Sequence, residues 1–192
     1  MGTWRDHFET LYRTSEDPWN YETSIYEREK YAETLRCLGG RRYLHGIEIG
    51  CSIGVLSADL APLCQRFTGV DLNERAASRA RARLSPLPGT EIVVAEIPGS
   101  WPAGRYDLIV LSEVLYFLSE DQIGMLAGKI ATDWLHQGDC VVVNWLGDTR
   151  TPLSGLEASD AFRRALARHV SFTDRLRGPV SSDYEMRLLR RC

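Results

Sequence analysis

No stretch of this 192-residue sequence is apolar for long enough to cross a bilayer. Positive charge is not in excess either, since 23 Lys and Arg face 26 Asp and Glu and give a net charge of −3. Binders of nucleic acid or of membrane surfaces usually carry a basic excess, so we expect neither partner. The N-terminal residues are polar and lack the apolar core of a signal peptide, which favours a cytoplasmic location.

Clustered metal ligands are missing as well. The five cysteines form no C-x-x-C pair and the four histidines form no ligand pair, so no metal is expected. An odd number of scattered cysteines is typical of reduced thiols. Cys51 lies in a glycine-rich segment, where we expect it to pack as a small residue rather than to act as a nucleophile.

Apolar strand patterns alternate with helical patterns along the chain, which predicts an α/β fold with a mostly parallel sheet. The length suits a single domain over residues 1–192. Within it we expect an N-terminal helical lid at 1–40 and an α/β core at 41–192, with a last antiparallel strand pair whose turn carries Gly178 and Pro179. The expected strands are 44–49, 67–71, 91–95, 106–111, 140–145, 170–176 and 184–189, and the expected helices 26–38, 53–64, 74–84, 120–135 and 158–168.

The most informative segment runs from Glu48 to Gly54 and reads E-I-G-C-S-I-G. It follows an apolar strand and opens a helix, with Gly50 and Gly54 four residues apart. A glycine-rich turn at this place lets a ligand approach the backbone, and an acid about 20 residues later reaches ribose hydroxyls. Asp71 has that spacing. The sequence therefore predicts a cofactor that contains adenosine.

Charge decides between two such cofactors. A nicotinamide dinucleotide carries a pyrophosphate, which needs backbone N–H groups without carboxylates nearby, and the usual G-x-G-x-x-G spacing is not met. Three acids, Glu48, Asp71 and Glu96, are expected at the carboxyl ends of adjacent strands. A carboxylate about 4 Å from a cation is worth roughly 4 kcal/mol at an effective dielectric constant of 20, before desolvation. S-adenosylmethionine, a cation without phosphate, is therefore favoured over a dinucleotide, and a domain that has lost catalysis is the third possibility.

This arrangement resembles the class I methyltransferases, and the resemblance covers nearly the whole chain. It implies a Rossmann-like fold with a seven-stranded, mostly parallel sheet and an antiparallel edge strand. The sequence departs from the family pattern at Ser52, where Gly is commoner, and at Glu96, where Asp is usual. The resemblance implies that a loop near the methionyl amine is formed by Glu48, Gly50, Cys51 and Gly54, that the ribose is held by Asp71 beside Leu72, and that adenine is read by Glu96 and Ile97.

A narrower resemblance lies near the N-terminus. Asp17-Pro-Trp19, Tyr21, Ser24, Tyr26-Glu27 and Lys30 look like the segment before the core in the nodulation protein S family, N-methyltransferases that act on chitooligosaccharide amines. The stretch 111–118 is similar to that family too. The resemblance implies S-adenosylmethionine-dependent N-methylation of a small molecule such as an amino sugar. Alternatives are a small-molecule O-methyltransferase and a non-catalytic cofactor- or RNA-binding module.

Several further side chains are candidates for contacting the cofactor or the methyl acceptor. Trp19 and Tyr26 are expected to cover the cofactor, with ordinary packing as the alternative for Trp19. Ser112 and Glu113 follow the fourth strand, where Ser112 is expected to contact the cofactor. Glu113 is expected to orient an acceptor amine or act as a weak base, with a helix N-terminal carboxylate as the alternative. Tyr116 is the second catalytic candidate. The basic face of helix 74–84 is expected to be solvated, and Trp145 suits the core as well as a site.

Overall fold

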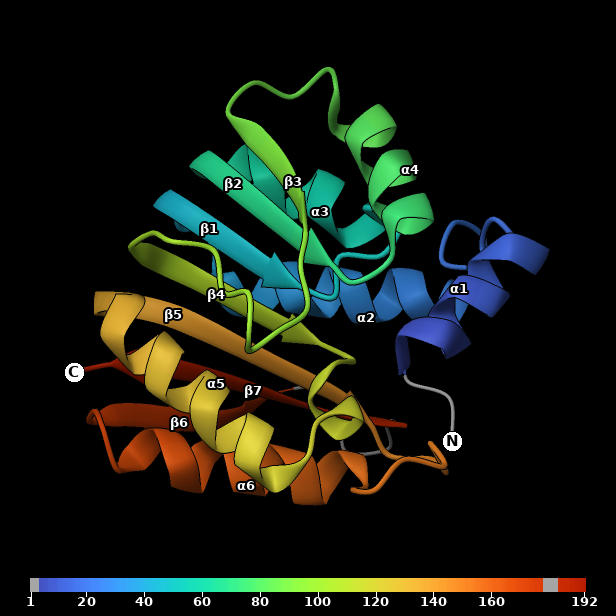
Figure 1. Cartoon of the computed structure of the whole chain (residues 1–192). Helices are drawn as coiled ribbons and strands as arrows, with labels where there is room; N and C mark the ends of the chain where they lie inside the picture. The colour runs from blue at the N-terminus through green and yellow to red at the C-terminus, as the bar shows by residue number, and fades with distance from the viewer. Residues whose placement is uncertain (1–3, 178–182) are drawn as a thin grey trace. The chain divides into compact units, whose positions relative to one another are not determined.

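The computed structural model describes residues 4–177 and 183–192 (Figure 1). The chain divides into two compact units, Met1–Glu96 and Ile97–Cys192. The predicted turn at Gly178 and Pro179 lies outside the described residues. No helix in the described part of the chain is both long and apolar enough to cross a membrane.

The first unit contains three parallel strands in the order β3-β2-β1. The side chains of β1 are buried at six of seven positions, as expected for a parallel strand that is covered on both faces. Helices α3 and α4 pack beside each other, and α1 lies against α4 (Figure 1). The elements are α1 Trp4–Thr14, α2 Ile25–Leu38, β1 Tyr43–Ile49, α3 Val55–Leu60, the 3-10 turn η1 Ala61–Leu63, β2 Cys64–Asp71, α4 Glu74–Leu84 and β3 Thr90–Val94.

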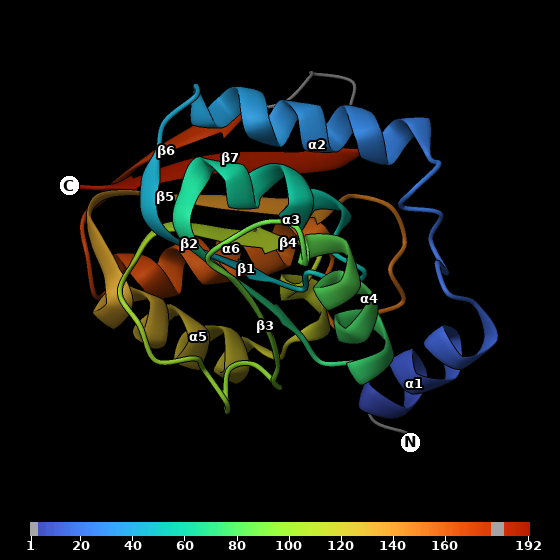
Figure 2. The same ribbon diagram turned by 90° about the horizontal axis from the view of Figure 1, so that it is seen from above.

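The second unit contains four strands in the order β4-β5-β7-β6. Strands β4 and β5 are parallel, whereas β7 runs antiparallel to both β5 and β6. Helices α5 and α6 lie side by side on one face of these strands (Figure 2). The elements are β4 Tyr106–Ser112, the 3-10 turn η2 Leu115–Phe117, α5 Glu120–Asp133, β5 Trp134–Trp145, α6 Gly155–Ala167, β6 Phe172–Arg177 and β7 Tyr184–Arg191.

These seven strands, mostly parallel and ending in an antiparallel pair, confirm the predicted fold class. Helix α4 has the predicted bounds, since Asn73 caps its first turn by accepting from the N–H groups of Arg75 and Ala76. Two predicted bounds differ from the structure by four residues or more, at the end of α3 and at the start of β5. The helix expected over 53–64 ends at Leu60, because Pro62 lacks the N–H group that would continue it.

The second wrong bound concerns β5. This strand was expected to begin at Cys140 after a stop at Gly138, but it begins at Trp134 and runs through the glycine. A Cβ at Gly138 would lie 2.8 Å from both the Leu135 carbonyl oxygen and the Trp134 indole nitrogen. The glycine is therefore required by close packing against Trp134 and does not end an element.

Gly54 offers a test of the packing between α3 and α4. Its φ is +78°, and a Cβ there would lie 3.0 Å from the Cα and Cβ of Ala80. We expect Gly54→Ala to lower the free energy of unfolding in urea by about 1–3 kcal/mol, through both the positive φ and the crowding. The matched control is Gly124→Ala in α5, where a Cβ meets nothing within 4 Å. That change should raise stability by about 0.5–1 kcal/mol. Equal effects of the two substitutions would contradict the assigned role of Gly54.

Candidate functional site

The glycine-rich turn is fixed to the end of β2 by its backbone. The N–H groups of Gly50 and Cys51 both donate to the carbonyl oxygen of Val70, at 2.8 and 3.0 Å. Gly50 and Gly54 have φ values of +79° and +78°, a left-handed conformation that glycine adopts without steric cost. The structure thus forms the strand–turn–helix connection that the sequence predicted.

Asp71 lies beside this turn with both carboxylate oxygens held. Oδ2 accepts from the Ser52 N–H and Oδ1 from the Asn73 N–H, each at 2.8 Å. Burial raises the pKa of the carboxyl group, and the bonds from these backbone N–H groups oppose that rise. Asp71 is partly exposed as a residue, and the two hydrogen bonds fix the orientation of its carboxylate. Asp71 and the glycine turn therefore come together as the sequence predicted, with Leu72 partly exposed next to them.

Cys51 is buried in the turn and has no catalytic environment. Burial, and then the negative charge of Asp71, raise the pKa of its thiol far above the usual value, so the thiolate is disfavoured. Its sulfur would lie 3.1 Å from a Cβ at Gly69, so the side chain packs closely against β2. This environment supports the expected packing role.

Ser52 shows how the chain accommodates a residue other than glycine in this turn. Its φ is +49°, a conformation that few residues other than glycine adopt. Its hydroxyl lies 2.5 Å from the hydroxyl of Tyr12 in α1. Tyr12 is buried in a cluster with Ile53 and Ala76. Tyr12 is not among the site residues predicted from the sequence, and the unusual serine in the motif was the one signal for this contact.

Glu48 differs from the sequence-based picture of three charged acids. It is buried, and its carboxylate accepts a hydrogen bond from the Ser57 hydroxyl. Burial raises the pKa of Glu48 to about 8, and the charge of Asp71 adds to the rise. Near pH 7 this carboxyl group is mostly protonated. Burial therefore disfavours the negative charge that the sequence-based argument assigned to Glu48.

Glu96 lies at the end of the first unit, with 61% of its side chain exposed. Its carboxylate forms an ion pair with Arg5 of α1, at 2.9 Å. A ligand amino group that bound Glu96 would compete with this arginine. Ile97, the next candidate, is buried at the start of the second unit.

The segment between α1 and α2 is a capped turn that presents Trp19. The carboxylate of Asp17 accepts from the N–H groups of Tyr21 and Glu22, at 2.9 and 3.0 Å. The Trp19 ring lies 5.7 Å from the Tyr12 ring and 5.6 Å from the Tyr21 ring. Trp19 stays 38% exposed. Trp19 therefore packs against α1 through Tyr12. Its expected role in covering the cofactor stays a prediction.

Tyr26 belongs to a buried ionic cluster at the start of α2. The Nζ atom of Lys30 lies 5.1 Å from the centre of the Tyr26 ring and 3.1 Å from the Glu27 carboxylate. Only 2% of the Lys30 side chain is exposed. Ser24 caps the helix by accepting from the Glu27 N–H. These contacts give the Tyr26-Glu27 and Lys30 motif a structural role.

The arginines of α4 hold the N-terminal segment in place. Arg75 forms an ion pair with Glu9 of α1, and Arg79 and Arg83 both contact Glu22. Arg83 also donates to the carbonyl oxygen of Ile53. The arginines stay partly exposed, as expected for a solvated face, and they also form ion pairs with residues that lie far away in sequence.

In the second unit, Glu113 directly follows Ser112, the last residue of β4. Its φ is +58°, and its backbone N–H donates to the Val143 carbonyl oxygen at 2.9 Å. Its Oε2 accepts from the Tyr116 hydroxyl at 2.8 Å and from the Trp145 backbone N–H at 2.7 Å. Strained backbone of this kind concentrates at functional sites. The structure thus brings the two predicted catalytic residues together.

The alternative role of Glu113 as a helix N-terminal carboxylate is not supported. The element after it is the three-residue turn η2, which begins at Leu115. The next α-helix, α5, has Ser119 as its N-cap, with a capping box completed by Gln122. Glu113 lies before both of these elements, so a helix dipole does not account for it.

Comparison with known proteins identifies the family of this chain. The family model described as Nodulation protein S matches residues 8–143. The chain belongs to the nodulation protein S family. This confirms the resemblance seen in the sequence. Residues 144–192 lie outside the matched segment.

The chain also matches individual curated proteins of this family. The chain is 37% identical over 108 residues to nodulation protein S of Bradyrhizobium diazoefficiens, covering 55% of this chain and 51% of the relative. It is 32% identical over 118 residues to nodulation protein S of Sinorhizobium fredii, covering 60% of this chain and 55% of the relative. The matches thus span about half the length of these curated relatives.

A solved structure supports the same fold. It is the N-methyltransferase nodulation protein S of Bradyrhizobium japonicum in complex with S-adenosyl-L-homocysteine. The similarity has a TM-score of 0.78 at 24% sequence identity and covers 96% of this chain and 97% of the other. The class I methyltransferase fold therefore extends over both units.

Glu48 generates a prediction about pH. Because the pKa of its carboxyl group is raised from its ordinary value of 4.5 to about 8, the folded state binds more protons than the unfolded state between these values. The free energy of unfolding should therefore fall as pH rises through this range, by at most about 1.4 kcal/mol per pH unit. Glu48→Gln should remove most of that fall, measured by urea denaturation from pH 5 to pH 8.

The control for this measurement is Glu91→Gln, which changes an exposed glutamate on β3. Its pH profile should match that of the unaltered protein. If the free energy of unfolding of Glu48→Gln falls with pH as steeply as that of the unaltered protein, Glu48 is ionised in the folded protein.

Proposed function

We propose that this chain is an S-adenosylmethionine-dependent methyltransferase that acts on a small-molecule amine, such as that of an amino sugar. The observation that carries the proposal is Asp71, a carboxylate fixed beside the glycine turn by the N–H groups of Ser52 and Asn73. A carboxylate in this place and orientation accepts hydrogen bonds from both hydroxyls of a ribose. We also propose that the chain has no nucleic-acid partner, because its net charge of −3 includes no basic excess.

The residues of the first unit fit such a cofactor. Gly50 has no Cβ to block approach to the backbone of the turn, and Asp71 is partly exposed at the end of β2. Glu48 lies behind the turn and is neutral without ligand, so a cationic ligand nearby would favour its ionised form. Glu96 would receive the adenine amino group in place of Arg5. When bound, the cofactor supplies a methyl group on a positively charged sulfur.

Glu113 is assigned to the acceptor. Its carboxylate is held by Tyr116 and by the backbone of Trp145, and it would accept an N–H bond from the acceptor amine. The amine nitrogen must arrive unprotonated, because its lone pair would form the bond to the methyl group that the cofactor would supply, with the electrons of the old bond left on the cofactor. The nitrogen becomes cationic in this step, so a fixed carboxylate stabilises it before its proton leaves.

The relatives support an amine acceptor, since the Bradyrhizobium japonicum structure is described as an N-methyltransferase. A hydroxyl acceptor is the second candidate, because Glu113 would accept from an O–H group as well. Transfer of a labelled methyl group to amino sugars, to small amines and to phenols would separate the two. A protein that binds the cofactor but methylates none of them would favour the non-catalytic module.

Replacing Asp71 tests the cofactor. Asp71→Asn keeps the size but removes the charge and places an N–H donor where an acceptor is needed. We expect affinity for S-adenosylhomocysteine to fall about 10- to 100-fold by titration calorimetry, the cost of losing a charged hydrogen-bond acceptor. The control Asp59→Asn changes an exposed aspartate of α3 and should bind normally. Tight binding of NADH with no affinity for S-adenosylhomocysteine would refute the proposal.

Replacing Glu113 tests the chemistry. Glu113→Gln retains an oxygen acceptor for Tyr116 and Trp145 but loses the charge that stabilises a cationic nitrogen. We expect kcat to fall about 10- to 1000-fold while the Kd for the cofactor changes less than about threefold. Glu120→Gln, at an exposed position in the first turn of α5, is the matched control. Unchanged turnover in Glu113→Gln would remove Glu113 from the mechanism.

A further inference from the structure

The turn between β1 and α3 contains one residue in a backbone conformation that its side chain disfavours. Ser52 has a φ of +49°, between Gly50 and Gly54, whose positive φ values cost a glycine nothing. A residue with a Cβ stays in this conformation only where the surrounding contacts hold it there. The contacts of Ser52 therefore decide whether the turn keeps its shape.

Two hydrogen bonds hold Ser52, one through its backbone and one through its side chain. The backbone N–H donates to the Asp71 carboxylate at 2.8 Å. The hydroxyl group lies 2.5 Å from the hydroxyl group of Tyr12 in α1, and the two share one hydrogen bond. If Ser52 relaxed to the negative φ that most residues adopt, its peptide group would rotate relative to the rest of the turn. The N–H group would then no longer point at Asp71.

Tyr12 offers Ser52 a partner that is itself fixed. Its side chain is buried in a cluster with Ile53 and Ala76. Its ring also makes an edge contact with the Trp19 ring, with 5.7 Å between the ring centres. Because packing sets the position of the ring, the phenol hydroxyl stays in one place without support from Ser52. The shared hydrogen bond therefore restrains Ser52 more than it restrains Tyr12.

The surroundings of Tyr12 also keep its hydroxyl group protonated. Burial, followed by the negative charge of Asp71, raises the pKa of Tyr12 far above its ordinary value of 10. A neutral phenol retains its proton for a hydrogen bond with the serine hydroxyl. It also places no second negative charge beside the Asp71 carboxylate.

We propose that Tyr12 is a positioning residue for the cofactor, which acts through Ser52 on Asp71. This role rests on the proposed function and deepens it, because it assigns to a side chain of α1 the geometry of the cofactor site. The Tyr12 hydroxyl stabilises the positive φ of Ser52, and the Ser52 N–H then holds one oxygen of Asp71. A carboxylate that is already oriented loses little freedom when it binds a ribose. Tyr12 needs no contact with the cofactor for this role.

The contribution of Tyr12 then depends on the residue at position 52. Serine at a positive φ needs contacts that offset its steric cost, whereas glycine needs none. With glycine at that position, the Tyr12 hydroxyl should be dispensable for binding. A tyrosine that touched the cofactor directly, or that only stabilised the fold, would matter equally with either residue.

Titration calorimetry with S-adenosylhomocysteine tests this dependence. Tyr12→Phe keeps the buried ring and removes only the hydroxyl, so we expect the Kd to rise about three- to tenfold, the cost of one hydrogen bond. Ser52→Ala keeps the Cβ and loses the hydroxyl, and should show a similar rise. Ser52→Gly loses both, and its Kd should change less than about twofold. Tyr12→Phe combined with Ser52→Gly should bind as Ser52→Gly does.

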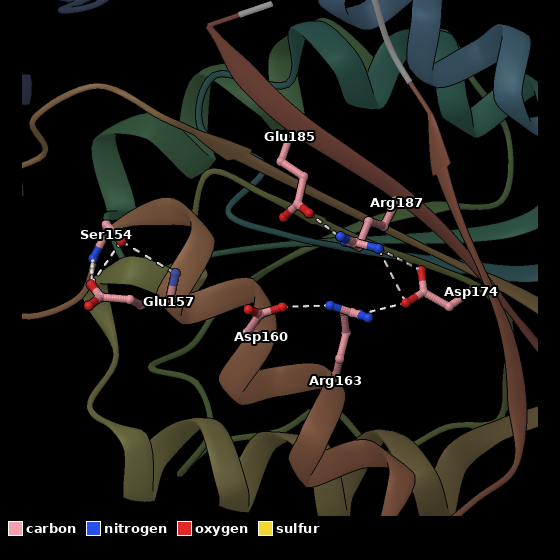
Figure 3. A network of polar contacts seen from close by, with 7 residues as sticks. All are labelled: Ser154, Glu157, Asp160, Arg163, Asp174, Glu185 and Arg187. Carbon is pink, nitrogen blue, oxygen red and sulfur yellow. Dashed lines mark hydrogen bonds and ion pairs between the residues drawn. The ribbon is translucent and has the colours of Figure 1, made fainter. Parts of the chain in front are cut away.

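Two controls separate affinity from stability. Tyr106→Phe removes the hydroxyl of another buried tyrosine, which donates to the Pro102 carbonyl oxygen at 3.1 Å. Ser154→Ala removes the hydroxyl that caps α6 by accepting from the Glu157 N–H (Figure 3). Both should lower the free energy of unfolding and leave the Kd unchanged. A rise of the Kd in these controls as large as in Tyr12→Phe would overturn the inference.

The comparison between backgrounds decides the role of Tyr12. If Tyr12→Phe raises the Kd by the same factor in the unaltered protein and in the Ser52→Gly background, the hydroxyl does not act through Ser52 and the inference fails. An unchanged Kd in Tyr12→Phe would also contradict it. The kcat of Tyr12→Phe at saturating cofactor should stay within about twofold, because the role lies in binding.

Absence of any binding of S-adenosylhomocysteine to the unaltered protein would instead refute the proposed function. Urea denaturation would still decide whether Tyr12 acts on Ser52. Tyr12→Phe should lower the free energy of unfolding more in the unaltered protein than in the Ser52→Gly background, where the hydroxyl has lost its partner. An equal loss in both backgrounds would overturn the coupling between the two residues.

Discussion

The hydrogen bonds that close the end of β2 onto the glycine turn determine the geometry of the first unit's candidate site. The Val70 carbonyl oxygen accepts two N–H groups of the turn, and the Asp71 carboxylate accepts one more from Ser52. The bond from the Ser52 N–H offsets the cost of the positive φ value at Ser52. The hydrogen bonds of this turn also leave Asp71 aimed in one direction before any ligand binds, so little order must be gained on binding.

Charge in this site is less uniform than a count of acids suggests. Glu48 is buried and mostly neutral near pH 7, while Glu96 is exposed and paired with Arg5. Asp71 is left as the acid that is both fixed and partly exposed. Because both candidate cofactors carry a ribose for Asp71, the proposed preference for the cationic one depends on the ionisation of Glu48 once a cation is near.

The features that could be predicted are those that depend on residues close together in the sequence. The glycine turn, the spacing to Asp71 and the bounds of α4 follow from turn geometry, strand length and an Asn cap, which act over a few residues. The pairing of Glu113 with Tyr116 was also accessible, because three residues separate them.

Features that depend on distant contacts were missed. Gly138 reads as a stop in sequence, yet the Trp134 indole is what requires a glycine there. Arg79 and Arg83 read as a solvated stripe because their partner Glu22 lies 57 and 61 residues away. The bond from Trp145 to Glu113 spans 32 residues and involves a backbone N–H group, which no side-chain pattern reveals.

The way α1 is attached has a consequence for the solution in which the protein works. Arg5 and Glu9 of α1, and Glu22 of the segment that follows it, all make their ion pairs at exposed positions. Dissolved salt screens such pairs, with a Debye length of about 8 Å at 0.15 M and about 3 Å at 1 M. The Tyr12–Ser52 hydrogen bond and the apolar contacts of Phe8 are hardly sensitive to it. A higher ionic strength therefore weakens the attachment of the first helix. At high salt the helix is held mainly by the hydrogen bond of Tyr12 and by its apolar cluster with Ile53 and Ala76.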